Sequence, residues 1–190
     1  MVATFTTGLM GSGKSKSLIK KIKKDNDLCI ALSAKLQEET GTIGKIESRN
    51  GQFIYSININ ANEHEKVTKF IKTLFSVQEL KTVYIDEVQF LSKTTLSEIL
   101  NEAIKNEIEI HFYGLSTTFT GDYFEGSRYL LREIEPMNIF NIPMNCQYEK
   151  CNSLAEYNAR IVNGKVVRNG DTFVEEKSKY LAYCKKHYFS

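Results

Sequence analysis

The chain has 190 residues, of which 42% are hydrophobic and 25% are charged, a composition typical of globular proteins. Its 25 lysine and arginine residues nearly balance 23 acidic residues, and the formal net charge is +2. This balance gives no support for electrostatic binding of nucleic acid. The sequence has no apolar run of the roughly 20 residues that span a bilayer and no signal-peptide pattern. We therefore expect a cytoplasmic protein without a nucleic-acid or membrane partner.

The first 115 residues alternate between short apolar runs and longer amphipathic segments. Strands are expected at residues 2–7, 28–32, 82–85 and 108–115. Helices are expected at residues 15–24, 63–75, 94–105 and 127–134. The polar, glycine-containing segment 37–51 is expected to be a loop. Strands that alternate with helices predict an α/β fold with a mainly parallel sheet flanked by helices.

The pattern changes after Pro143, where short strands and turns replace the alternation. Asn163-Gly164 lies between two β-rich runs and is a signal for a two-residue hairpin turn. We therefore expect two units, one spanning residues 1–143 and a small β-rich one spanning residues 144–190.

Residues 8–15 read G-L-M-G-S-G-K-S, a full match to the phosphate-loop pattern G-x-x-x-x-G-K-[ST]. In such a loop, successive backbone N–H groups and a helix N-terminus surround the phosphates of a nucleotide. Lys14 is expected to reach the β- and γ-phosphates, and Ser15 to bind magnesium. The residues expected to bind ATP here are Gly8, Leu9, Met10, Gly11, Ser12, Gly13, Lys14 and Ser15. The alternative is a glycine-rich turn with an incidental lysine.

Residues 83–90 read V-Y-I-D-E-V-Q-F, a β-rich run that ends in two carboxylates. Ligands of α/β sheets bind at the carboxyl ends of the strands, so Asp86 is expected to hold Mg²⁺, through water. Glu87 is expected to point the other way along the strand and to act as a general base. Alternatively, Asp-Glu only caps the segment that follows.

Cys146-x₄-Cys151 and Cys184-x₂-His187 form two pairs of potential metal ligands. Three cysteines and one histidine are a common ligand set for structural zinc, although the first spacing is long. The alternative is a set of incidental thiols and a surface histidine.

Together these motifs resemble those of thymidine kinases of the zinc-containing cellular and bacteriophage type. The resemblance rests on G-L-M-G-S-G-K-S, I-D-E-V-Q-F, Y-G-L-S-T-T-F-T-G-D-Y-F, the first cysteine pair and C-K-K-H-Y-F, in that order. It implies transfer of the ATP γ-phosphate to the 5′-hydroxyl of deoxythymidine, for nucleotide salvage, by a homotetramer. It further implies that Glu87 takes the hydroxyl proton, that Asp86 and Ser15 hold magnesium, and that Gln89 lies beside the ATP site.

The resemblance also implies a nucleoside site closed by a loop that zinc anchors. The residues that it places around the nucleoside are Met10, Phe90, Leu115, Phe119, Phe124, Asn158, Val174 and Tyr180. The aromatic residues of this set could instead be core residues beneath a loop.

The sequence departs from the family pattern at several positions. Glu39-Thr40-Gly41 stands where most members have Asp-Thr-Arg, so the arginine is absent, and Asn158 stands where relatives have threonine. Two other functions remain open at this stage. One is a P-loop motor or switch ATPase whose zinc module binds nucleic acid or protein, and the other is a relative that binds nucleotide without turnover.

Overall fold

The computed structural model describes residues 2–171 and 178–190. Its larger part is a seven-stranded sheet with the strand order β3-β4-β2-β5-β6-β1-β7, in which only the β3–β4 pair is antiparallel. The strands are β1 (Ala3–Gly8), β2 (Cys29–Lys35), β3 (Ile43–Glu47), β4 (Phe53–Asn60), β5 (Thr82–Asp86), β6 (Glu109–Tyr113) and β7 (Ile139–Ile142). The predicted α/β fold with a mainly parallel sheet is confirmed, with the four expected strands shifted by one to three residues at their ends.

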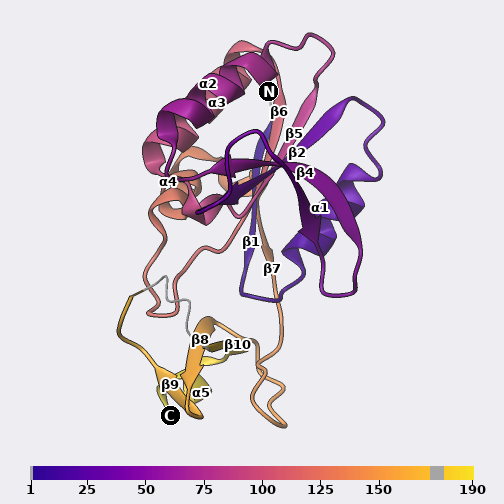
Figure 1. Ribbon diagram of the computed structural model, residues 1–190. Helices are drawn as coiled ribbons and strands as arrows, with labels where there is room; N and C mark the ends of the chain where they lie inside the picture. Colours follow the sequence, from indigo (N-terminus) through magenta and orange to yellow (C-terminus); the bar gives the residue numbers. More distant parts are fainter. Residues whose placement is uncertain (1, 172–177) are drawn as a thin grey trace.

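Helices cover both faces of this sheet, with α1 on one face and α2, α3 and α4 on the other (Figure 1). Their bounds are α1 (Lys14–Ile22), α2 (His64–Phe75), α3 (Lys93–Lys105) and α4 (Glu125–Glu133). Alternate residues of β5 follow this division, since Tyr84 packs in the core under α1 while Val83 and Ile85 pack in the other core. No helix within the described residues is both long and apolar enough to cross a membrane.

The prediction that residues 37–51 form a loop is wrong, because β3 lies within this segment. It pairs with β4 to form an antiparallel hairpin, which turns at residues 48–52. Ile46 of β3 is buried whereas Ile43 is 80% exposed, so the strand has almost no hydrophobic pattern of its own. It is a strand because it forms backbone hydrogen bonds with β4, and the sequence analysis did not predict β4 either. The strand β7 was also missed.

A second, three-stranded sheet has the order β10-β8-β9 and comprises β8 (Tyr157–Val162), β9 (Lys165–Val167) and β10 (Lys179–Tyr183). With the following helix α5 (Lys185–Phe189) it forms the smaller end of the molecule, hereafter the small lobe (Figure 1). The hairpin expected at Asn163-Gly164 is present, with φ values of 49° and 75° at these two residues. Strand β7 ends at Ile142, and the division at residue 143 stays a prediction.

Candidate functional site: a phosphate loop beside a second cavity

The phosphate loop connects β1 to α1 at the carboxyl edge of the sheet. Gly11 and Gly13 have φ values of 82° and 95°, a left-handed conformation that glycine adopts without strain. Lys14 is buried, and its Nζ donates hydrogen bonds of 3.0 Å to the carbonyl oxygens of Gly8 and Leu9. Burial lowers the pKa of Lys14, while the nearby Glu87 and Asp86 oppose this shift. The loop thus holds a lysine beside the two carboxylates that the sequence singled out.

Asp86 is the last residue of β5 and is 4% exposed. The Oγ of Ser15 donates to its Oδ2 at 3.3 Å, so the two residues expected to hold magnesium lie together. Burial, and then the neighbouring charge of Glu87, raise the pKa of Asp86 to about 7. A cation at this position would favour the ionised carboxylate.

Glu87 lies beyond the strand, because β5 ends at Asp86. The expectation that it points the other way along the strand is therefore wrong. Its φ of 58° is left-handed, which costs a residue with a side chain about 1 kcal/mol or more and is most often found at functional sites. The Nε2 of Gln89 donates to Glu87 Oε2 at 2.5 Å, and Gln89 Oε1 accepts from the backbone N–H of Leu115 at 3.0 Å. Buried Gln89 thus fixes the direction of the Glu87 carboxylate.

A cavity of about 580 Å³ opens above the phosphate loop. Of the residues expected to bind ATP, it is lined by Met10, Gly11, Gly13, Lys14, Ser15 and Gln89, and Glu87 also faces it. Gly8, Leu9, Ser12 and Asp86 were also expected to bind ATP but do not line the cavity. Phe90 and Leu115, expected around the nucleoside, line it too, and the lining residues that were not expected at any site are Lys16, Ala34, Lys35, Glu47, Ser48, Arg49 and Asn50.

Arg49 is the most informative of these missed residues. It lies in the β3–β4 turn, and its guanidinium covers Gly11 so closely that a Cβ there would be 2.5 Å from Cζ. Its positive charge also contributes to the lowered pKa of Lys14. Because the hairpin was not predicted, no sequence signal placed this arginine at the phosphate loop.

A second cavity, of about 710 Å³, adjoins the first and lies against the small lobe. Its lining includes every described residue expected around the nucleoside, namely Met10, Phe90, Leu115, Phe119, Phe124, Asn158 and Tyr180. Val174, also expected there, lies outside the described residues. Leu36, Gln37, Gln89, Thr117, Thr118 and Asp171 complete the lining and were not expected in it.

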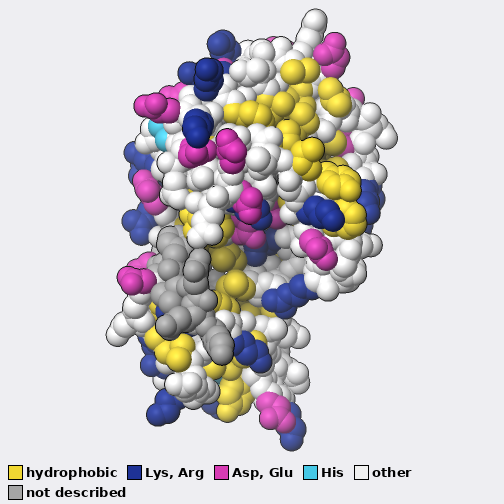
Figure 2. Space-filling view, viewed as in Figure 1, with side chains coloured by type: hydrophobic (Ala, Val, Ile, Leu, Met, Phe, Trp, Pro, Cys, Tyr) yellow, Lys and Arg dark blue, Asp and Glu magenta, His cyan; other side chains and the backbone are white. Residues whose placement is uncertain are grey.

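The two cavities adjoin each other, because Met10, Gln89, Phe90 and Leu115 line both of them. Figure 2 shows the surface hollowed between the large part of the molecule and the small lobe, with basic and acidic side chains at the hollow. A phosphate-binding loop therefore faces directly into a pocket with an apolar, aromatic lining. Such a pocket suits a flat, partly apolar ligand with a few polar groups.

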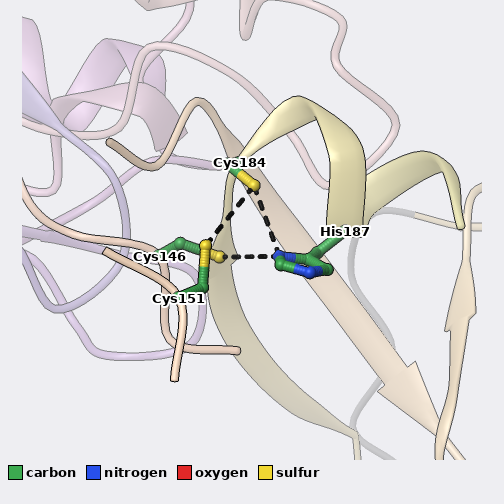
Figure 3. Close-up of side chains that lie close together, drawn as sticks. All are labelled: Cys146, Cys151, Cys184 and His187. Atoms are coloured by element: carbon green, nitrogen blue, oxygen red, sulfur yellow. Dashed lines mark hydrogen bonds between the residues drawn. The ribbon is translucent and has the colours of Figure 1, made fainter. Parts of the chain in front are cut away.

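The four expected metal ligands converge in the small lobe (Figure 3). The ligand atoms of Cys146, Cys151, Cys184 and His187 all lie within 4.8 Å of one another. His187 Nδ1 lies 3.5 Å from Cys146 Sγ and 3.4 Å from Cys184 Sγ, and Cys151 Sγ lies 4.0 Å from Cys184 Sγ. This compact set of three sulfur atoms and one nitrogen atom fits tetrahedral zinc, and the long spacing of the first pair does not prevent it.

Aromatic packing holds this cluster in place. The ring of Tyr148 stacks on His187 with centroids 4.0 Å apart, and Tyr157 stacks on Tyr188 at 4.3 Å. The hydroxyl of Tyr188 donates to the carbonyl oxygen of Phe119 at 2.7 Å. The metal cluster is thereby connected through the small-lobe core to a wall of the second cavity.

Comparison with known proteins agrees with these features. The family model described as thymidine kinase matches residues 1–188. A thymidine kinase of Bacillus subtilis subsp. natto is 46% identical over 190 residues, which is 100% of this chain and 97% of that protein. A thymidine kinase of Streptococcus pyogenes serotype M3 is 30% identical over 187 residues, and one of Shewanella oneidensis is 28% identical over 188 residues. These alignments cover 96% and 97% of this chain, and 94% of each relative. The resemblance found in the motifs is confirmed, and the chain belongs to the thymidine kinase family.

Proposed function

We propose that this enzyme transfers the γ-phosphoryl group of ATP to the 5′-hydroxyl of deoxythymidine and so forms dTMP for nucleotide salvage. The observation that carries the proposal is that two cavities adjoin, with a phosphate loop in one and an aromatic lining in the other. Glu87 lines the first cavity and accepts a hydrogen bond from Gln89, which lines both. The names of the relatives supply the identity of the nucleoside.

The first cavity would hold the triphosphate of ATP. Backbone N–H groups of the phosphate loop and the N-terminus of α1 would face the phosphates, and Lys14 would leave the carbonyl groups that it now contacts. Arg49 would add a second cation. It offers a guanidinium at the loop even though Gly41 stands where most family members have arginine.

Ser15 and Asp86 would hold a magnesium ion between them. A hydroxyl and a carboxylate are the oxygen ligands that Mg²⁺ prefers, and Mg²⁺ keeps much of its water when bound. When bound, the ion would offset the charge that develops on the phosphate oxygens.

Glu87 would act as the general base. Its carboxylate would accept the proton of the 5′-hydroxyl as that oxygen forms a bond to the γ-phosphorus and the bond to the β-phosphate oxygen breaks. The products are dTMP and ADP, with the proton on Glu87. Gln89 would keep the carboxylate directed at the hydroxyl.

The second cavity would hold the nucleoside. Met10, Phe90, Leu115, Phe119, Phe124 and Tyr180 would enclose the base and sugar, which keeps water from accepting the phosphoryl group. Val174 would belong to the same site. Zinc held by Cys146, Cys151, Cys184 and His187 would fix the small lobe against this cavity. From the resemblance we also propose a cytoplasmic homotetramer.

Release of ADP from MgATP tests this function. We expect strong stimulation by deoxythymidine and little ADP without a nucleoside, with deoxyuridine, deoxycytidine and single-stranded DNA measured in parallel. Stimulation by DNA alone would support the motor ATPase instead. No stimulation by any of these would point to a relative that binds nucleotide without turnover.

A further inference from the structure

Asn158 lies where three parts of the site meet, namely β8, the phosphate loop and the segment that begins at Thr117. Its side chain is 3% exposed. The Oδ1 atom accepts a hydrogen bond of 2.8 Å from the backbone N–H of Met10. The Nδ2 atom donates one of 3.0 Å to the carbonyl oxygen of Thr117. One buried amide therefore joins the small lobe to the phosphate loop and to a wall of the nucleoside cavity.

An amide suits this pair of bonds, because it offers an acceptor atom and a donor atom at two separate positions. Exchanging its oxygen and nitrogen would set an NH₂ group against the Met10 N–H and an oxygen against the Thr117 carbonyl, so the orientation of Asn158 is determined. A carboxylate could accept from Met10 but has no hydrogen to donate to Thr117. A threonine would have to contact both partners through a single oxygen atom. Asparagine instead contacts Met10 and Thr117 through two different atoms.

Met10 is the point at which this contact reaches the phosphate loop. It lies between Gly8 and Gly11, in a loop where Gly11 and Gly13 have left-handed φ values, so the loop sequence itself constrains the backbone weakly. Its N–H is committed to Asn158, and its side chain lines both cavities. Whatever fixes Asn158 therefore also fixes the peptide that precedes Met10.

Thr117 is the second hydrogen-bond partner of Asn158, on the side of the nucleoside cavity. It lines the nucleoside cavity and pairs with Tyr123 across the loop that holds Phe119. Asn158 itself lines the same cavity. A nucleoside bound in this cavity would therefore lie beside both partners of the Asn158–Thr117 hydrogen bond.

We propose that Asn158 is a positioning residue that couples the nucleoside cavity to the phosphate loop, so that each substrate strengthens the binding of the other. The coupling rests on the proposed function for the identity of the nucleoside. The nucleoside orders the Asn158 amide, the amide orders the Met10 peptide, and ATP then binds a loop that is already ordered. Because coupling between two binding sites is reciprocal, ATP tightens the nucleoside site by the same factor.

The test is the dissociation constant of the Mg²⁺ complex of the β,γ-imido analogue of ATP, measured calorimetrically without and with saturating deoxythymidine. The ratio of the two constants is the coupling factor. For the natural chain we expect a factor of at least about 5, the lower end of typical couplings. In Asn158→Leu, which keeps the branching and the number of side-chain heavy atoms but makes no hydrogen bonds, the factor should fall below about 2. In Asn158→Thr, which can keep one bond, it should lie between these values.

Tyr180→Phe is the matched control, since Tyr180 lines the nucleoside cavity but not the cavity at the phosphate loop. It should change deoxythymidine affinity and leave the coupling factor as in the natural chain. Melting temperature and zinc content show whether each variant is folded. If Asn158→Leu does not fold, the coupling factor of Asn158→Thr is used as the test instead.

Three outcomes would overturn the coupling: a factor near 1 in the natural chain, an unchanged factor in Asn158→Leu, or an unchanged factor in Asn158→Thr when Asn158→Leu does not fold. If the natural chain bound no deoxythymidine at all, the proposed function itself would fall. Binding without coupling would refute only the role of Asn158.

Discussion

Glu87 has a left-handed backbone one residue beyond β5, and Gln89 holds its carboxylate. A residue kept in this costly conformation is explained if its carboxylate must face the cavity at the phosphate loop. Replacing Glu87 by glutamine keeps the size of the side chain but removes its ability to accept the substrate proton. If Glu87 is the base, as we propose, the chemical step would lose it while the nucleotide site is preserved.

We therefore expect Glu87→Gln to lower the turnover number at least about 100-fold, the usual contribution of a general base. The dissociation constant of the imido analogue of ATP should remain within about twofold, since no phosphate ligand is lost. Glu79→Gln, at an exposed position before β5, is the control and should behave like the natural chain. Turnover by Glu87→Gln at the natural rate would show that another group takes the proton.

Asp86 gives the site a pH dependence. Its pKa is raised from 3.8 to about 7, chiefly by burial, so between these values the folded chain holds a proton that the unfolded chain has lost. Stability of the metal-free protein should then fall as the pH rises from about 4 to about 7. Magnesium requires the ionised carboxylate, so Mg²⁺ affinity should rise over the upper part of the same range.

Asp86→Asn cannot ionise and should remove this dependence. Without magnesium, we expect its melting temperature to exceed that of the natural chain by roughly 5–10 °C more at pH 8 than at pH 5, corresponding to about 2–3 kcal/mol. Thermal unfolding at the two pH values measures this. An equal difference at both pH values would mean that Asp86 is already ionised at pH 5.

At the scale of elements, the β3–β4 hairpin brings a cation to the phosphate loop. The guanidinium of Arg49 covers Gly11, whereas Lys45 on the same hairpin lies over the rings of Phe53 and Tyr55.

We expect Arg49→Met to raise the KM for ATP about tenfold or more, because a charge-assisted hydrogen bond contributes about 1.5–3 kcal/mol. The KM for deoxythymidine should change little. Lys45→Met removes a hairpin charge away from the site and should change neither, and equal effects of the two variants would contradict a specific role for Arg49.

The hairpin also shows where sequence reasoning ends. The phosphate loop could be predicted because its spacing of glycine, lysine and serine directly reflects how a backbone surrounds phosphate. Strand β3 could not be predicted, because only Ile46 of its residues is buried. Its pairing with β4 is a contact between two segments, which the local sequence pattern does not show. Arg49 therefore stayed unnoticed, as did the left-handed Glu87, whose side chain could not be oriented by extending the strand pattern past Asp86.

The small lobe is the second element with a testable role. Its core contains the three cysteines of the metal cluster together with tyrosine and aliphatic side chains, and it contacts Phe119 through Tyr188. Removing zinc with a chelator, or by Cys184→Ser, should lower the melting temperature, because metal binding contributes to folding stability. Deoxythymidine affinity should fall at least about tenfold and affinity for the ATP analogue much less. Metal analysis measures the zinc content and calorimetry the two affinities, with Cys29→Ser as the control. Unaltered nucleoside binding in zinc-free protein would contradict this role of the small lobe.

At the scale of the whole molecule, two adjoining cavities are lined by different parts of the chain. The α/β sheet provides the phosphate loop, Asp86 and Glu87, and the small lobe provides Asn158 and Tyr180. Motifs in sequence order predicted both sets of residues and their chemistry. Their contact could not be derived from the motifs, because Asn158 meets Met10 across 148 residues.

We propose that the phosphoryl group passes directly from ATP in the first cavity to the nucleoside in the second. The most direct measurement follows labelled γ-phosphate from MgATP into dTMP and into free phosphate, with and without deoxythymidine. We predict one dTMP for each ADP formed and almost no free phosphate, and loss of dTMP formation in Glu87→Gln. Free phosphate as the main product, independent of deoxythymidine, would contradict this account.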